Sequence, residues 1–151
     1  MSVIPGVVIG PPVLFPEKVE DINGTIKPIW EVVSGKNKRL PRKVGTGMFV
    51  DVRDLVGVCA GLAVVGGMEL DGKRVIVVAG KGDPLAMVKA LWEKYPKRLG
   101  HLDCIVRDGV VEEEAVPTFD TRDAKKLLGK GWTGYERSVR DTAESLERYL
   151  G

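Results

Sequence analysis

The sequence predicts an α/β protein, with two parallel strands from a truncated Rossmann-type sheet and a helical subdomain. Three observations lead to this class. VIPGVVI and RVIVVAG are continuous apolar runs, which is typical of strands buried on both faces of a parallel sheet. The segments that follow them carry apolar residues at helical spacing. A chain of 151 residues, 44% apolar and 29% charged, can form one folded domain over residues 1–151 rather than a disordered segment.

The first half of the chain is expected to contain one strand, two helices and a short second strand. The opening strand covers residues 3–9 and ends at a glycine and two prolines. A helix over residues 25–34 follows a proline-bearing loop, and Gly35 lies just past its end. After a basic segment at residues 36–43, a short strand leads into a second helix. Asp51 is predicted to cap that helix, with Asp54 as the acid of a capping box.

The second half is expected to begin with the other long apolar strand, at residues 73–80. Asp83 and Pro84 predict the start of a helix over residues 83–95, which Pro96 would end. Irregular structure with strand-like pieces is expected around residues 101–120. Two more helices are predicted over residues 121–128 and 138–150.

Composition and charge exclude several classes of protein. A net charge of +2 is too small to indicate nucleic-acid binding, and the basic segment has no interleaved aromatic residues for stacking on bases. Cys59, Cys104 and the single histidine, His101, have no metal-ligand spacing, so no metal site is predicted. Few cysteines, no signal peptide and no apolar run long enough for a bilayer lead us to expect a cytoplasmic protein without membrane contact.

The turn Gly80-Lys81-Gly82 follows a strand and opens a helix, as a dinucleotide-binding loop would. Leu85 stands where the fingerprint has its third glycine, and no acidic residue closes a second strand about 20 positions later. We therefore interpret the turn as a tight, capped connection and predict no cofactor site.

Five segments in a fixed order resemble the C-terminal half of extended short-chain dehydrogenases/reductases. They are VIPGVVIGPPV, INGTIKPIWEVVSGK, FVDVRDL, KRVIVVAG and FDTRDAKKLLG with YERSVRDTAESL. The resemblance points to the aldehyde, dihydroflavonol and cinnamoyl-CoA reductase-like branch of the NAD-dependent epimerase/dehydratase family. It implies that the two long strands are the sixth and seventh of a Rossmann sheet. The glycine-rich phosphate loop and the Ser/Tyr/Lys catalytic set would then precede residue 1. Cys59 departs from the family pattern, which has histidine there.

A substrate-binding half without its cofactor half suggests three functions. The first is a cofactor-independent isomerase, cyclase or lyase that acts on an apolar carbonyl metabolite in a biosynthetic pathway. The second is a non-catalytic binding or regulatory protein, and the third is an inactive reductase half that needs a partner chain. For catalysis we expect Arg53 to stabilise an enolate-like oxygen, and His101 or Asp51 to move a proton. The residues expected at the mouth of the substrate pocket are Pro12, Phe15, Asn23 and Trp30.

The opening strand would keep one neighbour and expose its other edge, an arrangement that proteins rarely leave in water. We therefore expect a homodimer or a higher oligomer in which the half-sheets join.

Overall fold

The computed structural model describes residues 2–36, 47–65, 72–102 and 117–150. Most of the basic segment and Cys104 lie outside these residues. The strands are β1 (Ser2–Pro5), β2 (Val7–Ile9), β3 (Met48–Asp51), β4 (Arg74–Val77) and β5 (Gly80–Lys81). The α-helices are α1 (Lys27–Val33), α2 (Val52–Val65), α3 (Pro84–Trp92), α4 (Pro96–Leu99), α6 (Arg122–Leu128) and α7 (Tyr135–Ser145). Short 3₁₀ turns are η1 (Val19–Asp21), η2 (Gly100–Leu102) and η3 (Glu147–Tyr149).

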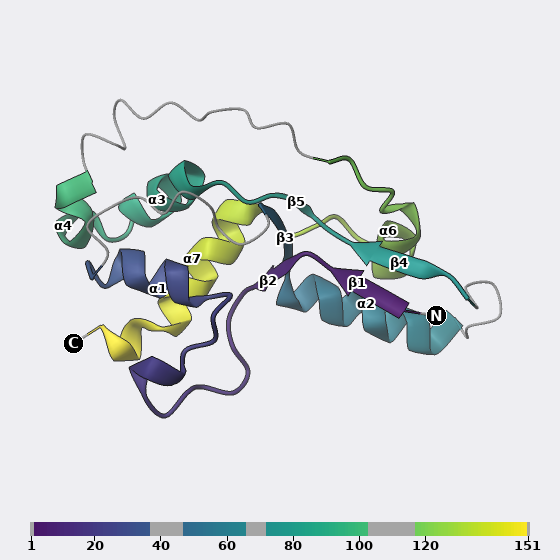
Figure 1. Ribbon diagram of the computed structural model, residues 1–151, viewed down its shortest axis with the longest axis horizontal. Coiled ribbons are helices and arrows are strands. Elements are labelled where there is room, and N and C mark those ends of the chain that lie inside the picture. The colour runs from purple at the N-terminus through teal and green to yellow at the C-terminus, as the bar shows by residue number, and fades with distance from the viewer. Residues whose placement is uncertain (1, 37–46, 66–71, 103–116, 151) are drawn as a thin grey trace.

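The molecule is elongated, with two groups of elements on either side of short central strands (Figure 1). One lobe holds β1, β4, α2 and α6, and the chain begins there. The other lobe holds α1, α3, α4 and α7, and the chain ends there. β2, β3 and β5 lie between the two lobes, so the start of α2 is close to the centre of the molecule.

The expected parallel α/β arrangement is confirmed, but the opening strand is not continuous. β1 pairs in parallel with β4, so Ser2 lies opposite Arg74. β2 instead pairs in parallel with β3, which also pairs with β5 in the antiparallel direction. The prediction of one strand over residues 3–9 was therefore wrong in this detail.

Gly6 is the residue at which the strand changes partners. Its N–H still donates to the carbonyl of Val77, at 3.0 Å. A Cβ at this position would lie 2.8 Å from the carbonyl oxygen of Met48, at the start of β3. Only glycine allows the chain to pass this close to a neighbouring backbone.

The helices match the predicted segments, although their ends differ. Asp83 caps α3 as expected, because its carboxylate accepts a hydrogen bond from the N–H of Ala86 at 2.7 Å. α3 ends at Trp92, and Pro96 opens α4 instead of ending a longer helix. α7 starts at Tyr135 and ends at Ser145, so both of its ends lie earlier in the chain than the expected 138 and 150.

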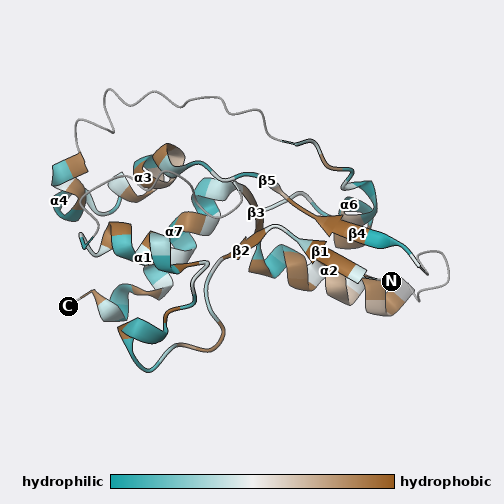
Figure 2. Ribbon diagram, in the orientation of Figure 1, coloured by the Kyte–Doolittle hydropathy of each residue, from teal (hydrophilic) through white to brown (hydrophobic). Residues whose placement is uncertain are grey.

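Apolar side chains form separate clusters in the two lobes. In the lobe of α1, α3 and α7, the fully buried residues include Ile29, Val33, Met87, Leu91 and Val139. In the other lobe, Val50, Val58, Val75 and Val77 pack between the β1–β4 pair and the helices α2 and α6. A smaller cluster joins Ile22, Ile26, Trp30 and Leu146. Figure 2 also shows hydrophobic residues along most of α2.

Candidate functional site

Asp51 ends β3 and lies at the centre of a polar cluster that joins β3, α2 and α7. Its side chain is fully buried. One carboxylate oxygen accepts hydrogen bonds from the backbone N–H and the Nε of Arg53, both at 2.8 Å. The other oxygen accepts from Nη2 of Arg53 at 2.7 Å and from the hydroxyl of Ser138 at 2.6 Å. The bond to the Arg53 N–H is the expected capping bond, so this prediction is confirmed.

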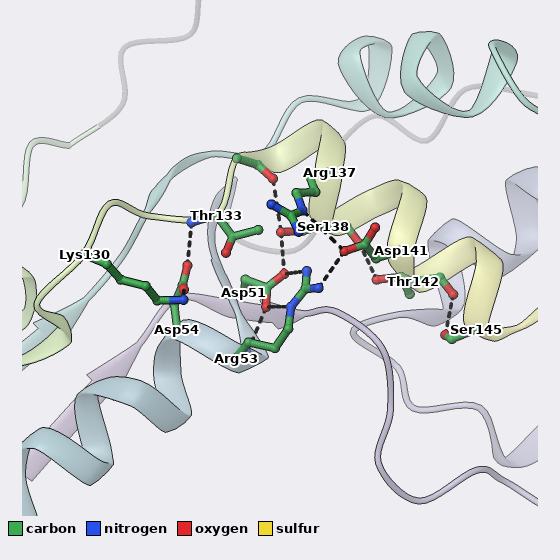
Figure 3. Close-up of polar contacts among 11 residues, drawn as sticks. Asp51, Arg53, Asp54, Lys130, Thr133, Arg137, Ser138, Asp141, Thr142 and Ser145 are labelled. Atoms are coloured by element: carbon green, nitrogen blue, oxygen red, sulfur yellow. Dashed lines mark hydrogen bonds and ion pairs between the residues drawn. The ribbon is translucent and has the colours of Figure 1, made fainter.

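Arg53 extends the cluster to a second carboxylate. Its Nη1 donates to Asp141 on α7 at 2.6 Å, and Nε of Arg137 lies 3.8 Å from the same carboxylate (Figure 3). Arg53 is therefore held between the end of β3 and the outer side of α7. Its side chain is 40% exposed, so these contacts enclose Arg53 only in part.

The electrostatics of the cluster follow from these contacts. Burial alone would raise the pKa of Asp51, but the hydrogen bonds from Arg53 and Ser138 outweigh it and lower this pKa. The hydrogen bond to Asp51 raises the pKa of Arg53 further above its ordinary value. Both groups are charged at neutral pH.

The hydrogen bonds of Asp51 and Arg53 limit the catalytic roles predicted for them. A carboxylate that accepts four hydrogen bonds and has a lowered pKa is a weak proton acceptor. Arg53 has five side-chain N–H donors, and its three side-chain hydrogen bonds to Asp51 and Asp141 leave two for a ligand. An anionic oxygen there would also be repelled by the carboxylates of Asp51 and Asp141. The arrangement is that of a clamp between α2 and α7.

Asp54 does not form the predicted capping box, so this prediction was wrong. Its buried carboxylate turns to the loop before α7, where one oxygen accepts from the N–H of Thr133 at 2.6 Å. The Lys130 ammonium lies 3.1 Å from the other oxygen (Figure 3). Asp54 thus holds the α6–α7 loop against the first turn of α2.

His101 does not join the Asp51 cluster. It is exposed and lies in η2, directly after α4. Figure 1 shows α4 at one end of the molecule, whereas the β3–α2 junction lies at its centre. The expected role of His101 in proton transfer stays a prediction, and it would require a site separate from Arg53.

Three of the four residues expected at the pocket mouth lie on the segment between β2 and α1, and the fourth, Trp30, lies within α1. Pro12 is half-buried, and Phe15 is stacked under Arg148, whose guanidinium carbon lies 4.0 Å from the ring centroid. Asn23 is exposed and accepts hydrogen bonds from the N–H and hydroxyl of Thr25. Trp30 is buried in α1. Their roles in binding a substrate stay predictions.

Trp30 has an unsatisfied donor. Its indole N–H is buried and has no hydrogen-bond partner among the described residues. The ammonium of Lys36 lies 4.6 Å from the centroid of its ring. An unpaired buried N–H costs about 1–3 kcal/mol, which an acceptor on a ligand would recover.

Sequence reasoning missed Ser138 and Asp141, which complete the cluster. The available signal was the polar stripe of α7, where Ser138 and Thr142 alternate with Val139 and Ala143 on the buried side. The hydroxyl of Thr142 donates to the carbonyl of Ser138 within the helix at 2.6 Å, whereas the hydroxyl of Ser138 donates to Asp51 on β3 at 2.6 Å. Such a stripe indicates contact with a polar group on another element.

The turn before α3 does not fit a dinucleotide. The N–H of Gly82 donates to the carbonyl of Gly47 at 2.7 Å, and the Asp83 carboxylate occupies the N-terminus of α3. A Cβ at Gly82 would lie 3.2 Å from the Tyr135 ring, so side-chain packing explains this glycine. A carboxylate in the position that a pyrophosphate would take repels it.

Within the described residues, no three or more His, Cys, Asp or Glu side chains gather as metal ligands would. In the same part of the chain, no helix has the length and apolar character needed to cross a bilayer.

The fold is found in longer solved structures. No protein-family model matches the sequence, and no curated protein does. Gre2 from Candida albicans in complex with NADPH is 22% identical, with a TM-score of 0.66 over 97% of this chain and 43% of that one. A second structure of Gre2 from Candida albicans gives 22% identity and a TM-score of 0.65 over 99% and 45%. A structure titled as structure-guided engineering of a reductase is 19% identical, with a TM-score of 0.56 over 96% and 43%.

These comparisons establish the fold, which is similar to part of a Rossmann-type reductase. The chain spans less than half the length of each of these structures.

Proposed function

We propose that this chain binds an apolar carbonyl compound as the substrate-side part of a Rossmann-type reductase fold, without binding nicotinamide nucleotide itself. The proposal depends on how much of each chain is superposed in the structural comparisons. Nearly the whole chain superposes on less than half of longer chains, one of which is titled as an NADPH complex.

Two features of the residues support the two parts of this proposal. The indole N–H of Trp30, a residue expected at the mouth of the substrate pocket, is a buried donor without a partner among the described residues. A carbonyl oxygen is an acceptor that would satisfy this donor. The Gly80-Lys81-Gly82 turn has a carboxylate at the helix start, which opposes phosphate binding.

The geometry favours binding over the first expectation of a cofactor-independent isomerase, cyclase or lyase. Asp51 and Arg53 neutralise one another, and His101 lies in a different part of the molecule. One observation still supports a cofactor-independent enzyme. Arg53 is partly exposed and has two further N–H donors.

Isothermal titration calorimetry with the full chain tests the proposal. The probes are a medium-chain aldehyde, an aryl ketone, the alcohols that correspond to them, and NADPH. We expect saturable heat with a carbonyl compound, weaker binding of its alcohol and no saturable heat with NADPH. Saturable binding of NADPH, or the absence of binding by every carbonyl probe, would overturn the proposal.

The Trp30→Phe variant tests the proposed donor. Loss of one hydrogen bond of about 1 kcal/mol weakens carbonyl binding about fivefold. Trp132→Phe is the matched control, because its indole N–H is also buried without a partner among the described residues, but it packs beside α6 in the other lobe. If both substitutions changed the affinity for the carbonyl probe equally, Trp30 would not be the donor to the ligand.

A further inference from the structure

α2 is apolar around its whole circumference once its first turn is passed. Charged residues occur at Arg53 and Asp54, and every residue from 55 to 65 is apolar or glycine. A helix of this composition is normally buried on all sides, whereas a surface helix has a polar face. Figure 2 shows hydrophobic residues along α2.

One side of α2 is covered by its own lobe. Val58 and Leu62 are buried against β4 and α6, and Leu55 packs on the same cluster. Gly57 and Gly61 let α6 approach, because a Cβ at either position would lie within 3 Å of Leu128 or Leu127. These contacts account for one face of the helix.

The opposite side of α2 carries an exposed apolar stripe. Its members lie three and four residues apart, so they share one face. Val56 is 61% and Val64 is 85% exposed. The stripe consists of Val56, Cys59, Ala60, Ala63 and Val64.

This stripe is complementary to itself. In an antiparallel crossing of two copies centred on Ala60, each Val56 meets the Val64 of the other copy. The small residues Cys59, Ala60 and Ala63 lie between these valines, where they allow the two helices to approach closely. No charged residue lies within the stripe, so an isologous contact buries no like charges.

The edge of β1 is a poor place for the expected joining of half-sheets. The N–H groups of Ser2 and Gly6 donate to carbonyls at either end of β4, at Lys73 and Val77. Because N–H groups alternate in direction along a strand, those of Val3 and Pro5 belong to the open edge. Pro5 has no N–H, so Val3 is the one residue of β1 with a donor for another strand there.

We propose that the α2 stripe is a homodimer interface, in which a second copy of this chain packs across a two-fold axis near Ala60. A standard interface buries about 800 Å² on each partner, more than five small side chains provide. The stripe therefore forms the apolar centre of the interface, and neighbouring residues complete the rim.

Light scattering and sedimentation velocity with the full chain test this interface. The wild type is expected to form a dimer, and Val64→Lys to weaken self-association at least tenfold, as for a residue at the centre of an interface. Val13→Lys is the control, because Val13 is also exposed, at 88%, but lies in the loop after β2. Val64 is so exposed that this change leaves the fold intact, which far-UV circular dichroism checks.

Disulfide trapping gives an independent readout of the geometry. A Cys104→Ser chain retains Cys59, which lies one residue from the proposed axis and is an exposed free thiol. Mild oxidation is expected to produce a covalent dimer on a non-reducing gel, and Cys59→Ser to prevent it. A monomer at every concentration would overturn the proposal and leave the stripe to a different protein. A dimer that survives Val64→Lys would also overturn it. Neither result would affect the ligand titrations.

Discussion

The clamp at Asp51 predicts a large loss of stability on substitution with alanine. Asp51→Ala removes the capping bond to the N–H of Arg53, three side-chain hydrogen bonds and the buried negative charge. The Ser138 hydroxyl, which has one proton, can then donate to the carbonyl of Gly134 at 3.2 Å instead, and Arg53 retains its bond to Asp141. The hydrogen bonds that the substitution removes are therefore those that join the end of β3 to the first turns of α2 and α7.

The magnitude follows from these contacts. Loss of a helix cap costs about 1 kcal/mol. Breaking a buried ion pair costs about 3–5 kcal/mol, and the partly exposed Arg53 can be hydrated, which places the total near the low end. We expect the free energy of unfolding to fall by about 3 kcal/mol. For a chain of this length, the melting temperature would then fall by about 6–12 °C.

Urea unfolding followed by tryptophan fluorescence measures this loss, and the chain contains its own control. Asp120 and Arg122 form the same three bonds as Asp51 and Arg53, at 3.1, 2.9 and 2.6 Å. Their side chains are 60% and 89% exposed. We expect Asp120→Ala to leave the urea midpoint unchanged. A loss for Asp51→Ala no larger than that for Asp120→Ala would refute the reasoning.

Three further predictions concern pH, helix packing and capping. Because the folded-state pKa of Asp51 lies below its ordinary value of 3.8, its contribution is complete above that pH and is lost as pH falls towards the folded pKa. The stability difference between wild type and Asp51→Asn should therefore shrink in urea titrations below pH 4. Gly61→Ala would place a Cβ 2.5 Å from the Leu127 carbonyl oxygen and should cost about 1–3 kcal/mol in the same assay. Gly57→Ala meets only the end of the Leu128 side chain and should be near neutral, so equal losses would contradict the packing argument. Asp83→Ala should cost about 1 kcal/mol through the lost cap of α3, and an unchanged urea midpoint would contradict it.

The sequence predicted the α/β class and the positions of the helices because these depend on local periodicity and capping residues. Asp83 followed by Pro84 gave the start of α3 correctly, since both effects act within one turn. The break in the opening strand was not predictable in this way. It depends on how closely β3 approaches Gly6, a contact between residues about 40 positions apart.

The same limit applies to the ends of helices. Pro96 was predicted to end a helix, because proline disrupts a helix interior. Proline is equally suited to the first turn, where α4 uses it. α3 ends at Trp92, before Pro96 is reached. A proline after a helical pattern is compatible both with the end of one helix and with the start of the next, and the local sequence does not distinguish the two.

The two Asp-X-Arg segments show why the candidate site could be predicted only in part. Asp51 with Arg53, and Asp120 with Arg122, have the same spacing and make the same local hydrogen bonds. Sequence alone therefore gives both the same chemistry. The difference comes from Ser138, which reaches Asp51 from 87 residues away and helps to enclose its carboxylate. In a buried carboxylate that is fully hydrogen-bonded, stability and reactivity oppose one another, since each bond that lowers the pKa also weakens the base. A pairing that suggested catalysis in the sequence is, for this reason, better suited to holding α2 and α7 together.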